Sequence, residues 1–301
     1  MALQSSGAIN LANIQTEMGG SNPIGMNEYY RGGANVVNQS SNNSIPTSGT
    51  ISMSNFYGGS NEYVIPYSCR FETSTDTLLS RTHGSPTSQK VWTWSGWLKR
   101  DNLGNGSDVN TISGIVASGN YGQDYEDIVF PYAGSEANRL QYFNAGPGTA
   151  QGHKVTNFTF NSTTTWWHIL VRRNNSDVDI FINGSEATNW LINSGVNNTY
   201  AAFNRSGRIH RVGSSERNRF QYTGNMAEIN FIDGQALAPS SFGETRSGAW
   251  KPNLYTGTYG NNGYRLNFSN ANSLGADSSG RGNNFSTTNL SADHRETDVP
   301  F

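Results

Sequence analysis

The chain has 301 residues, of which 34% are hydrophobic and 14% charged, and its formal net charge at pH 7 is −2. Both fractions lie below those of average globular proteins, and the 34 glycines together with abundant Asn, Ser and Thr favour turns over helix interiors. These values argue against a mostly helical protein, and the small net charge gives no electrostatic reason to expect nucleic acid binding or membrane binding.

Aromatic residues make up 12% of the chain, which argues against disorder because large rings bury much surface when a chain folds. No apolar run approaches 18 residues, so membrane insertion is not expected. The N-terminus lacks the basic and apolar regions of a secretory signal. A single cysteine, Cys69, excludes an internal disulfide framework. We therefore expect an all-β protein that is made in a cytoplasm.

The first 59 residues contain a short internal repeat, with one copy over residues 6–14 and a second over residues 48–56. The shared pattern is S-G-x-I-[NS]-[LM]-[AS]-N-[IF], and a Gly-Gly pair follows each copy. Asn10 and Ser52 are expected to cap short helical turns by accepting hydrogen bonds from free backbone amides. Residues 1–59 are therefore predicted to be a small module of short helical turns and loops.

A third turn is predicted to begin at Asn27. Short turns with so few apolar side chains are marginal alone, so we interpret residues 1–59 as an assembly module that a partner surface completes. The alternative is a subdomain that packs on the rest of the same chain. The residues expected to take part in assembly are Ile9, Leu11, Ile14, Tyr29, Tyr30, Ile51, Met53 and Phe56.

Residues 60–301 show the alternation of apolar and polar side chains that is typical of strands. Asn183-Gly184 follows one such run and is a strong hairpin signal. Many short strands between polar turns, without alternating helices, predict a mainly β fold: a two-sheet antiparallel sandwich of jelly-roll type. The predicted strands span residues 64–71, 91–98, 112–116, 128–130, 140–143, 155–160, 166–172, 177–182, 208–213, 224–232 and 264–268.

Several of these runs resemble a known fold family. Trp92-Thr-Trp-Ser-Gly-Trp-Leu-Lys-Arg100 is similar to an inner strand of the laminin-G-like, concanavalin A-like jelly roll. Trp167-His-Ile-Leu-Val-Arg172 and Ile180-Phe-Ile-Asn-Gly184 resemble its central hairpin. Further runs resemble the lectin-like structural proteins of tailed bacteriophages, particularly marine phages and cyanophages. These runs span residues 236–244, 248–252, 260–264 and 274–285.

That resemblance implies a non-enzymatic virion structural protein, most simply a homo-oligomeric tail fibre or spike-like appendage. Residues 1–59 would bind other phage virion proteins, and the β-sandwich would recognise a glycan on the host surface. The alternative is a capsid decoration or connector protein that uses the sandwich only for packing. A polysaccharide depolymerase ranks below both. The family often closes on D-[ST]-P-T-N-N, whereas this chain closes on Thr297-Asp-Val-Pro-Phe301, which leaves the role of the tail open.

Catalytic chemistry has one local candidate, the run Asp124-Tyr-Glu-Asp127. Glycosidases need two carboxylates that flank the scissile bond, and Asp124 and Glu126 would share one face of a strand. The run lacks the E-x-D-x-E pattern of the glycosidase branch, so a solvated acidic loop is the favoured interpretation. The five histidines show no metal-ligand spacing. We therefore predict no enzymatic activity and no required cofactor.

Glycan binding would use an aromatic ring beside Asn, Asp or Arg on the loops. Asn189 and Trp190 follow the Asn183-Gly184 turn and form one candidate pair. The second candidate, favoured slightly because Gly257 and Gly260 could let the backbone approach a ligand, comprises Tyr255, Tyr259, Asn261 and Asn262. The competing interpretation is that the rings of Trp190 and Tyr259 belong to the core.

A structural calcium ion is the one metal that the residue types suit. Asp277 and Asn283 lie in a glycine-rich loop and offer oxygen ligands of the kind that calcium prefers. Residues 101–108 have a similar composition. Neither loop matches the spacing of a known local calcium motif. The alternative is a turn in which Asp and Asn side chains bond their own backbone.

Overall fold

The computed structural model of the chain describes all residues except 1, 39, 104–106, 120–121, 148 and 216–219. The chain forms two compact units. The N-terminal unit comprises Met1–Val64 and Phe242–Leu254, and the sandwich unit comprises Ile65–Ser241 and Tyr255–Phe301. The predicted boundary after residue 59 lies near the first division, but residues 242–254 join the N-terminal unit although they were assigned to the sandwich.

Short turns make up most of the N-terminal unit. Its helical elements are α1 (Leu11–Met18), η1 (Met26–Tyr29), η2 (Ser40–Asn42) and η3 (Met53–Phe56), and the hairpin of β14 (Gly243–Arg246) and β15 (Ala249–Pro252) completes it. None of the helices within the described parts of the chain is both long enough and apolar enough to span a membrane.

Three of these turns, α1, η1 and η3, begin with the same kind of hydrogen bond. In each, the residue before the turn donates its backbone amide to the side chain three residues later. The pairs are Asn10 to Asn13 Oδ1 at 3.1 Å, Gly25 to Glu28 Oε1 at 2.8 Å, and Ser52 to Asn55 Oδ1 at 2.7 Å. Each of these bonds satisfies one backbone amide at the start of its turn. In α1 the capping is reciprocal, because the Asn10 side chain also accepts from the Asn13 amide at 2.9 Å. The repeat therefore has three copies, and the third begins at Met26, one residue before the prediction.

The N-terminal unit has a core of its own. Ile14, Tyr29 and Phe56, which occupy equivalent positions in the three copies, are fully buried, and the Tyr29 and Phe56 rings meet edge to face at 6.0 Å. The remaining core residues are Met18, Val36 and Ile45. The segment therefore does not need a partner to bury its apolar residues, because three turns and the chain between them supply enough of them.

This core corrects part of the assembly prediction. Ile14, Tyr29 and Phe56 cannot form an assembly surface, since their side chains are enclosed by their own unit. Tyr30 is half-buried and donates its hydroxyl to the carbonyl of Gly49. Four other predicted residues are partly buried against the core, and their role in assembly stays a prediction; they are Ile9, Leu11, Ile51 and Met53.

The sandwich unit consists of two large antiparallel sheets, which confirms the predicted fold class. The first sheet has the order β10-β9-β8-β3-β13-β1-β18, with β16 also paired to β13. Its strands are β1 (Ser68–Phe71), β3 (Val91–Arg100), β8 (Trp167–Asn174), β9 (Asp177–Ile182), β10 (Ser185–Glu186), β13 (Gly224–Asp233), β16 (Tyr264–Leu266) and β18 (Arg295–Glu296).

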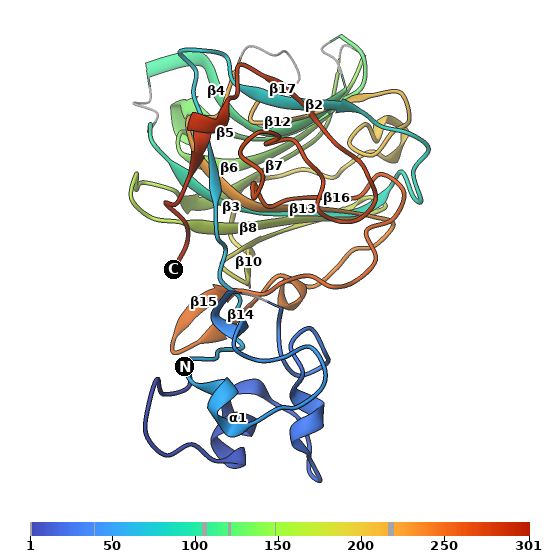
Figure 1. Ribbon diagram of the computed structural model, residues 1–301. Coiled ribbons are helices and arrows are strands. Elements are labelled where there is room, and N and C mark those ends of the chain that lie inside the picture. The colour runs from blue at the N-terminus through green and yellow to red at the C-terminus, as the bar shows by residue number, and fades with distance from the viewer. Residues whose placement is uncertain (1, 39, 104–106, 120–121, 148, 216–219) are drawn as a thin grey trace. The chain divides into compact units, whose positions relative to one another are not determined.

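The second sheet has the order β11-β7-β6-β5-β4-β12-β2-β17 and faces the first as a separate layer (Figure 1). Its strands are β2 (Leu78–Thr82), β4 (Ser107–Gly119), β5 (Tyr125–Ala133), β6 (Arg139–Gly146), β7 (Thr149–Thr159), β11 (Trp190–Asn193), β12 (Ile209–Val212) and β17 (Ser286–Thr288). Short helical turns η4 (Gly134–Glu136), η5 (Asn198–Tyr200), η6 (Pro239–Ser241) and η7 (Ala292–His294) lie in the connections.

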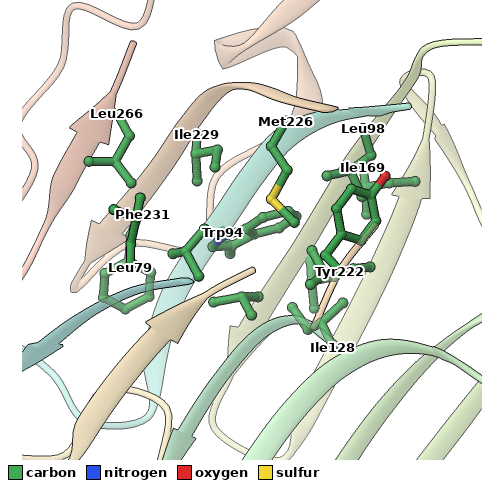
Figure 2. Close-up of a cluster of buried hydrophobic side chains, with 14 of the residues drawn as sticks. Leu79, Trp94, Leu98, Ile128, Ile169, Tyr222, Met226, Ile229, Phe231 and Leu266 are labelled. Carbon is green, nitrogen blue, oxygen red and sulfur yellow. The ribbon is translucent and has the colours of Figure 1, made fainter. Parts of the chain in front are cut away.

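The core lies between the two sheets. Trp92 and Trp94 alternate on β3 and are fully buried, and Figure 2 shows Trp94 beside Met226 of β13, with Ile128 of β5 opposite. Burial of large apolar side chains is the main stabilising contribution, at about 25 cal/mol per Å² of apolar surface removed from water. Period-two alternation thus produces the inward-facing set on which the sandwich is built.

The C-terminal residues are bound to the first sheet. β18 pairs with β1, and the Asp298 carboxylate forms an ion pair with Lys99 and accepts a hydrogen bond from Trp166 Nε1 at 3.1 Å. The Phe301 ring is 5.7 Å from the ring of Trp97. The tail, whose role the sequence left open, therefore contributes contacts to this sheet.

Candidate functional site

A hollow of about 450 Å³ lies beside β7, β8, β9 and β10 and the connection from β10 to β11. Because β10 and β11 are the edge strands of the two sheets, this edge hollow borders one side of the sandwich. Its wall combines two aromatic rings with several amide side chains and a single ionisable group. The residues used below are Asn157, Phe158, Trp167, Asn183, Glu186 and Asn189.

A tight turn shapes one side of the edge hollow. Asn183 and Gly184 have φ angles of +47° and +78°, and they join β9 to β10 as the two-residue hairpin that the sequence predicts. Asn183 is attached to β8 twice: its backbone amide donates to the His168 carbonyl, and its Oδ1 accepts from the His168 amide, both at 2.9 Å. The Asn183 amide group is thereby oriented, with its Nδ2 left as a donor.

The aromatic wall centres on Phe158, near the end of β7. Its side chain is 41% exposed, which is unusual for a large apolar residue of this chain. Edge-to-face contacts hold the ring against Trp167 at 5.1 Å and against the buried ring of Phe160 at 4.9 Å. An exposed ring in a fixed orientation offers a flat apolar face to a ligand.

Polar groups surround that ring. Asn157 Oδ1 accepts a hydrogen bond from Arg139 Nη1 at 2.8 Å, so its Nδ2 remains a donor. The Asn189 carbonyl accepts from the Asn157 backbone amide at 3.0 Å, which ties the connection before β11 to β7. Glu186 is exposed on β10 and is the one charged residue among the described residues that line the hollow. The edge hollow therefore presents donors, acceptors and an apolar face together.

Only one residue of the first predicted pair, Asn189, lines the edge hollow. Asn189 lines the edge hollow, whereas Trp190 is half-buried against the sandwich core and does not line it. Lys154 Nζ lies 4.8 Å from the centroid of the Trp190 ring and donates to Asn193 Oδ1 at 2.7 Å. Trp190 thus supports the edge strand, and its role in glycan binding stays a prediction.

A second hollow of about 430 Å³ contains part of the other predicted set. Tyr259 and Asn261 line it, but the Tyr259 ring is only 6% exposed, and its hydroxyl donates to Asn230 Oδ1 at 2.7 Å. Burial raises the pKa of Tyr259. Tyr255 packs edge to face on this ring at 5.2 Å and donates its hydroxyl to the Thr258 carbonyl at 3.1 Å. This hollow offers little aromatic surface.

Asn262 is a correction, because it is buried and fully occupied by its own chain. Its Oδ1 accepts from the Gly84 amide at 2.9 Å, and its Nδ2 donates to the Gly84 carbonyl at 3.0 Å and to Asn204 Oδ1 at 2.9 Å. Gly260 is likewise required by its neighbours, because a Cβ there would lie 2.1 Å from the Asp233 carbonyl oxygen. The glycine that favoured this site is therefore required for chain packing.

The carboxylates considered for catalysis are structural. Glu126 is fully buried, where it forms an ion pair with Arg173 and accepts hydrogen bonds from the Tyr142 hydroxyl and the Phe203 amide. Burial and the Glu126 charge raise the pKa of Tyr142. Asp124 is 4% exposed and is paired with two arginines, Arg205 and Arg208. The predicted solvated loop is therefore wrong, since both carboxylates hold buried or partly buried arginines.

The structure does bring Asp277 and Asn283 together. The Asp277 carboxylate accepts from the backbone amides of Arg265, Ser279 and Asn283 at 2.8–2.9 Å and from the Ser279 hydroxyl. Asn283 binds the chain through both atoms of its amide group. These bonds explain the loop as an Asp-Asn turn, and the calcium role stays a prediction.

No group of three or more His, Cys, Asp and Glu side chains suited to a metal ion occurs among the residues that the structure describes. The other loop considered for calcium, residues 101–108, lies partly outside them.

Sequence reasoning missed Phe158 and Trp167, because both lie in runs that predict strands. No signal in the sequence separates Phe158, which is 41% exposed, from the buried Phe160, because both belong to the same predicted strand over residues 155–160.

No protein-family model and no curated protein matches the sequence. Among solved structures, a candidate carbohydrate-binding protein from Bacteroides ovatus has a TM-score of 0.52 at 17% identity, over 79% of this chain and 62% of its own. The two share a fold. The chain thus spans less than two thirds of that protein.

Two other solved structures match more weakly. Mouse laminin α1 domains LG4-5 have a TM-score of 0.40 at 12% identity, over 57% of this chain and 43% of their own. Tailspike protein 2 of the Escherichia coli O157:H7 bacteriophage CAB120 has a TM-score of 0.39 at 12% identity, over 57% of this chain and 23% of its own. Neither score is high enough to support an inference.

Proposed function

We propose that the sandwich unit is a non-enzymatic carbohydrate-binding domain and that the edge hollow is its glycan site. The observation that carries this proposal is the exposed, fixed ring of Phe158 beside the amides of Asn157, Asn183 and Asn189. Sugars present C–H faces that pack on aromatic rings and hydroxyls that need fixed polar partners. The fold shared with the candidate carbohydrate-binding protein from Bacteroides ovatus is consistent with this role.

For the whole protein we propose a structural role in the virion of a tailed phage, as a tail fibre or spike-like appendage that recognises a host surface glycan. The sequence resemblance to phage lectin-like proteins supports it. The N-terminal unit would attach the protein to other virion proteins as a folded module, because its core is complete within the unit. The competing role is capsid decoration or a connector, in which the sandwich serves only for packing.

The site is tested by removing the exposed ring. The full chain and its Phe158→Ala variant would be applied to a glycan array, and affinities for the glycans bound would then be measured by calorimetry. We expect the variant to lose about tenfold or more in affinity, as one aromatic contact of about 1.5 kcal/mol would imply. Its melting temperature should change little because the ring is already 41% exposed.

Two matched variants separate this site from its neighbours. Trp190→Ala and Tyr259→Ala remove rings that pack on the core, so both should lower the melting temperature and keep glycan affinity per folded molecule. Full affinity of Phe158→Ala would contradict the proposed site. Failure of the full chain to bind any glycan would contradict the proposed function.

The place on the particle is tested by immunogold labelling of virions of the phage that encodes the chain. Label at the distal tail would support the appendage role, and label over the capsid would support decoration. Virions that lack the chain would refute both.

A further inference from the structure

The charges around the edge hollow bear on which sugars it accepts. Among the described residues that line it, Glu186 alone is ionisable, and none is Lys, Arg or His. Glu186 is exposed and forms no ion pair with any residue that the structure describes. A ligand in the hollow would therefore meet one uncompensated negative charge.

Two cationic side chains of the neighbouring strands β6 and β7 are already engaged. Arg139 donates to the Asn157 side chain and carbonyl and to the Ser135 carbonyl at 2.9 Å. Lys154 donates to Asn193 and lies over the Trp190 ring. Neither side chain lines the hollow, so neither is placed to neutralise a carboxylate or sulfate on a ligand.

We propose that the edge hollow selects uncharged sugars and excludes acidic ones, with Glu186 as the residue that decides between them. This inference rests on the proposed glycan-binding function. A sugar hydroxyl donates to the Glu186 carboxylate and accepts from Asn157 Nδ2 or Asn183 Nδ2, while the C–H face of the same ring packs on Phe158. An uronic acid or sulfated sugar offers the same face and donors but places a second negative charge beside Glu186.

The physical reason is that the Glu186 carboxylate attracts a neutral sugar hydroxyl but repels an anionic sugar. With a hydroxyl, it forms a charge-assisted hydrogen bond, which is about twice as strong as a neutral one. With an anionic sugar, like charges in a partly dehydrated hollow repel, and the repulsion weakens as salt screens it. Cationic amino sugars, which lack that repulsion, are expected to bind at least as well as neutral ones.

The test compares sugars that differ only in charge. Affinities of the full chain would be measured for galactotriose against trigalacturonate and for mannotriose against trimannuronate, with an array of neutral and acidic glycans in parallel. We expect neutral members to bind at least about tenfold more tightly than their acidic counterparts. The Glu186→Gln variant should lose about tenfold for neutral sugars and narrow or abolish the discrimination. The control variant Asp293→Asn removes an exposed carboxylate of η7 that does not line the hollow, and it should change neither value.

The outcomes are distinct. Equal or tighter binding of acidic sugars, or unchanged discrimination in Glu186→Gln, overturns the selectivity and leaves the glycan-binding function standing. If no neutral or acidic glycan binds, the proposed function fails and the selectivity fails with it. A preference for neutral sugars that disappears in Glu186→Gln supports both.

Discussion

Acidification from pH 7 to pH 5 should destabilise the sandwich through three buried histidines. Burial lowers the pKa of His83 to about 3, with a further contribution from the charge of Arg81, and burial lowers the pKa of His168 to about 3. Burial also holds the pKa of His210 well below its usual value, and the neighbouring His83 adds to that shift. Each ring is therefore neutral in the folded protein, whereas an unfolded chain protonates it near pH 6.5.

The direction and size of this stability change follow from the linkage between proton binding and unfolding. Because the folded pKa lies below the unfolded pKa, the unfolded chain binds more protons as the pH falls, and stability present above about pH 6.5 is lost on the way toward pH 3. One such histidine costs about 2 kcal/mol between pH 7 and pH 5, so three cost about 6 kcal/mol. That is a large part of the roughly 5–15 kcal/mol that stabilises a typical domain.

Urea unfolding at pH 7, 6 and 5 would measure this loss. Tryptophan fluorescence reports mainly on the sandwich, because six of the seven tryptophans belong to it. His168→Gln should be less stable at pH 7, since it disturbs the contact with Ser95 Oγ at 2.9 Å, but should lose about one third less stability on acidification. A loss below about 2 kcal/mol between pH 7 and pH 5 would refute the reasoning.

Four further variants test the packing within each unit. Glu126→Gln leaves Arg173 buried without its counter-charge and should cost about 3–5 kcal/mol in urea unfolding, so an unchanged midpoint would refute the buried ion pair. Ile14→Ala should cost the N-terminal unit about 2–5 kcal/mol and leave unfolding of the sandwich unchanged, with the two units followed separately by hydrogen exchange of their backbone amides. Gly213→Ala places a Cβ 2.3 Å from a phenylalanine ring at a φ of +81° and should prevent stable folding. Gly207→Ala, at a φ of +76° with no atom within 4 Å of the new Cβ, should cost only about 1–2 kcal/mol; equal effects of the two would show that the close approach is unimportant.

The sandwich could be predicted from the sequence because its signals are local. Trp92 and Trp94 alternate with polar residues on one strand, and Asn183-Gly184 can adopt the positive φ angles that a two-residue hairpin requires. The third copy of the N-terminal repeat is harder to detect, because Gly25 and Glu28 stand where the other copies have Asn or Ser and Asn. The same capping hydrogen bond forms although the residue types differ.

Of the residues that line the candidate site, the sequence indicated only one on a loop, Asn189, which follows a turn. Phe158 was missed because alternation does not show which rings a sheet edge leaves uncovered. Asn262 was wrongly assigned for the opposite reason: a polar residue in a loop can be buried when distant segments, here those of Gly84 and Asn204, supply all its hydrogen bonds.

Seven of the ten residues that line the edge hollow lie between Ile182 and Asn189, in one continuous piece of chain. Under the proposed function, an exchange of residues 182–189 would therefore replace seven of these lining residues at once, Glu186 among them. Phe158 and the tryptophan core between the sheets would stay the same.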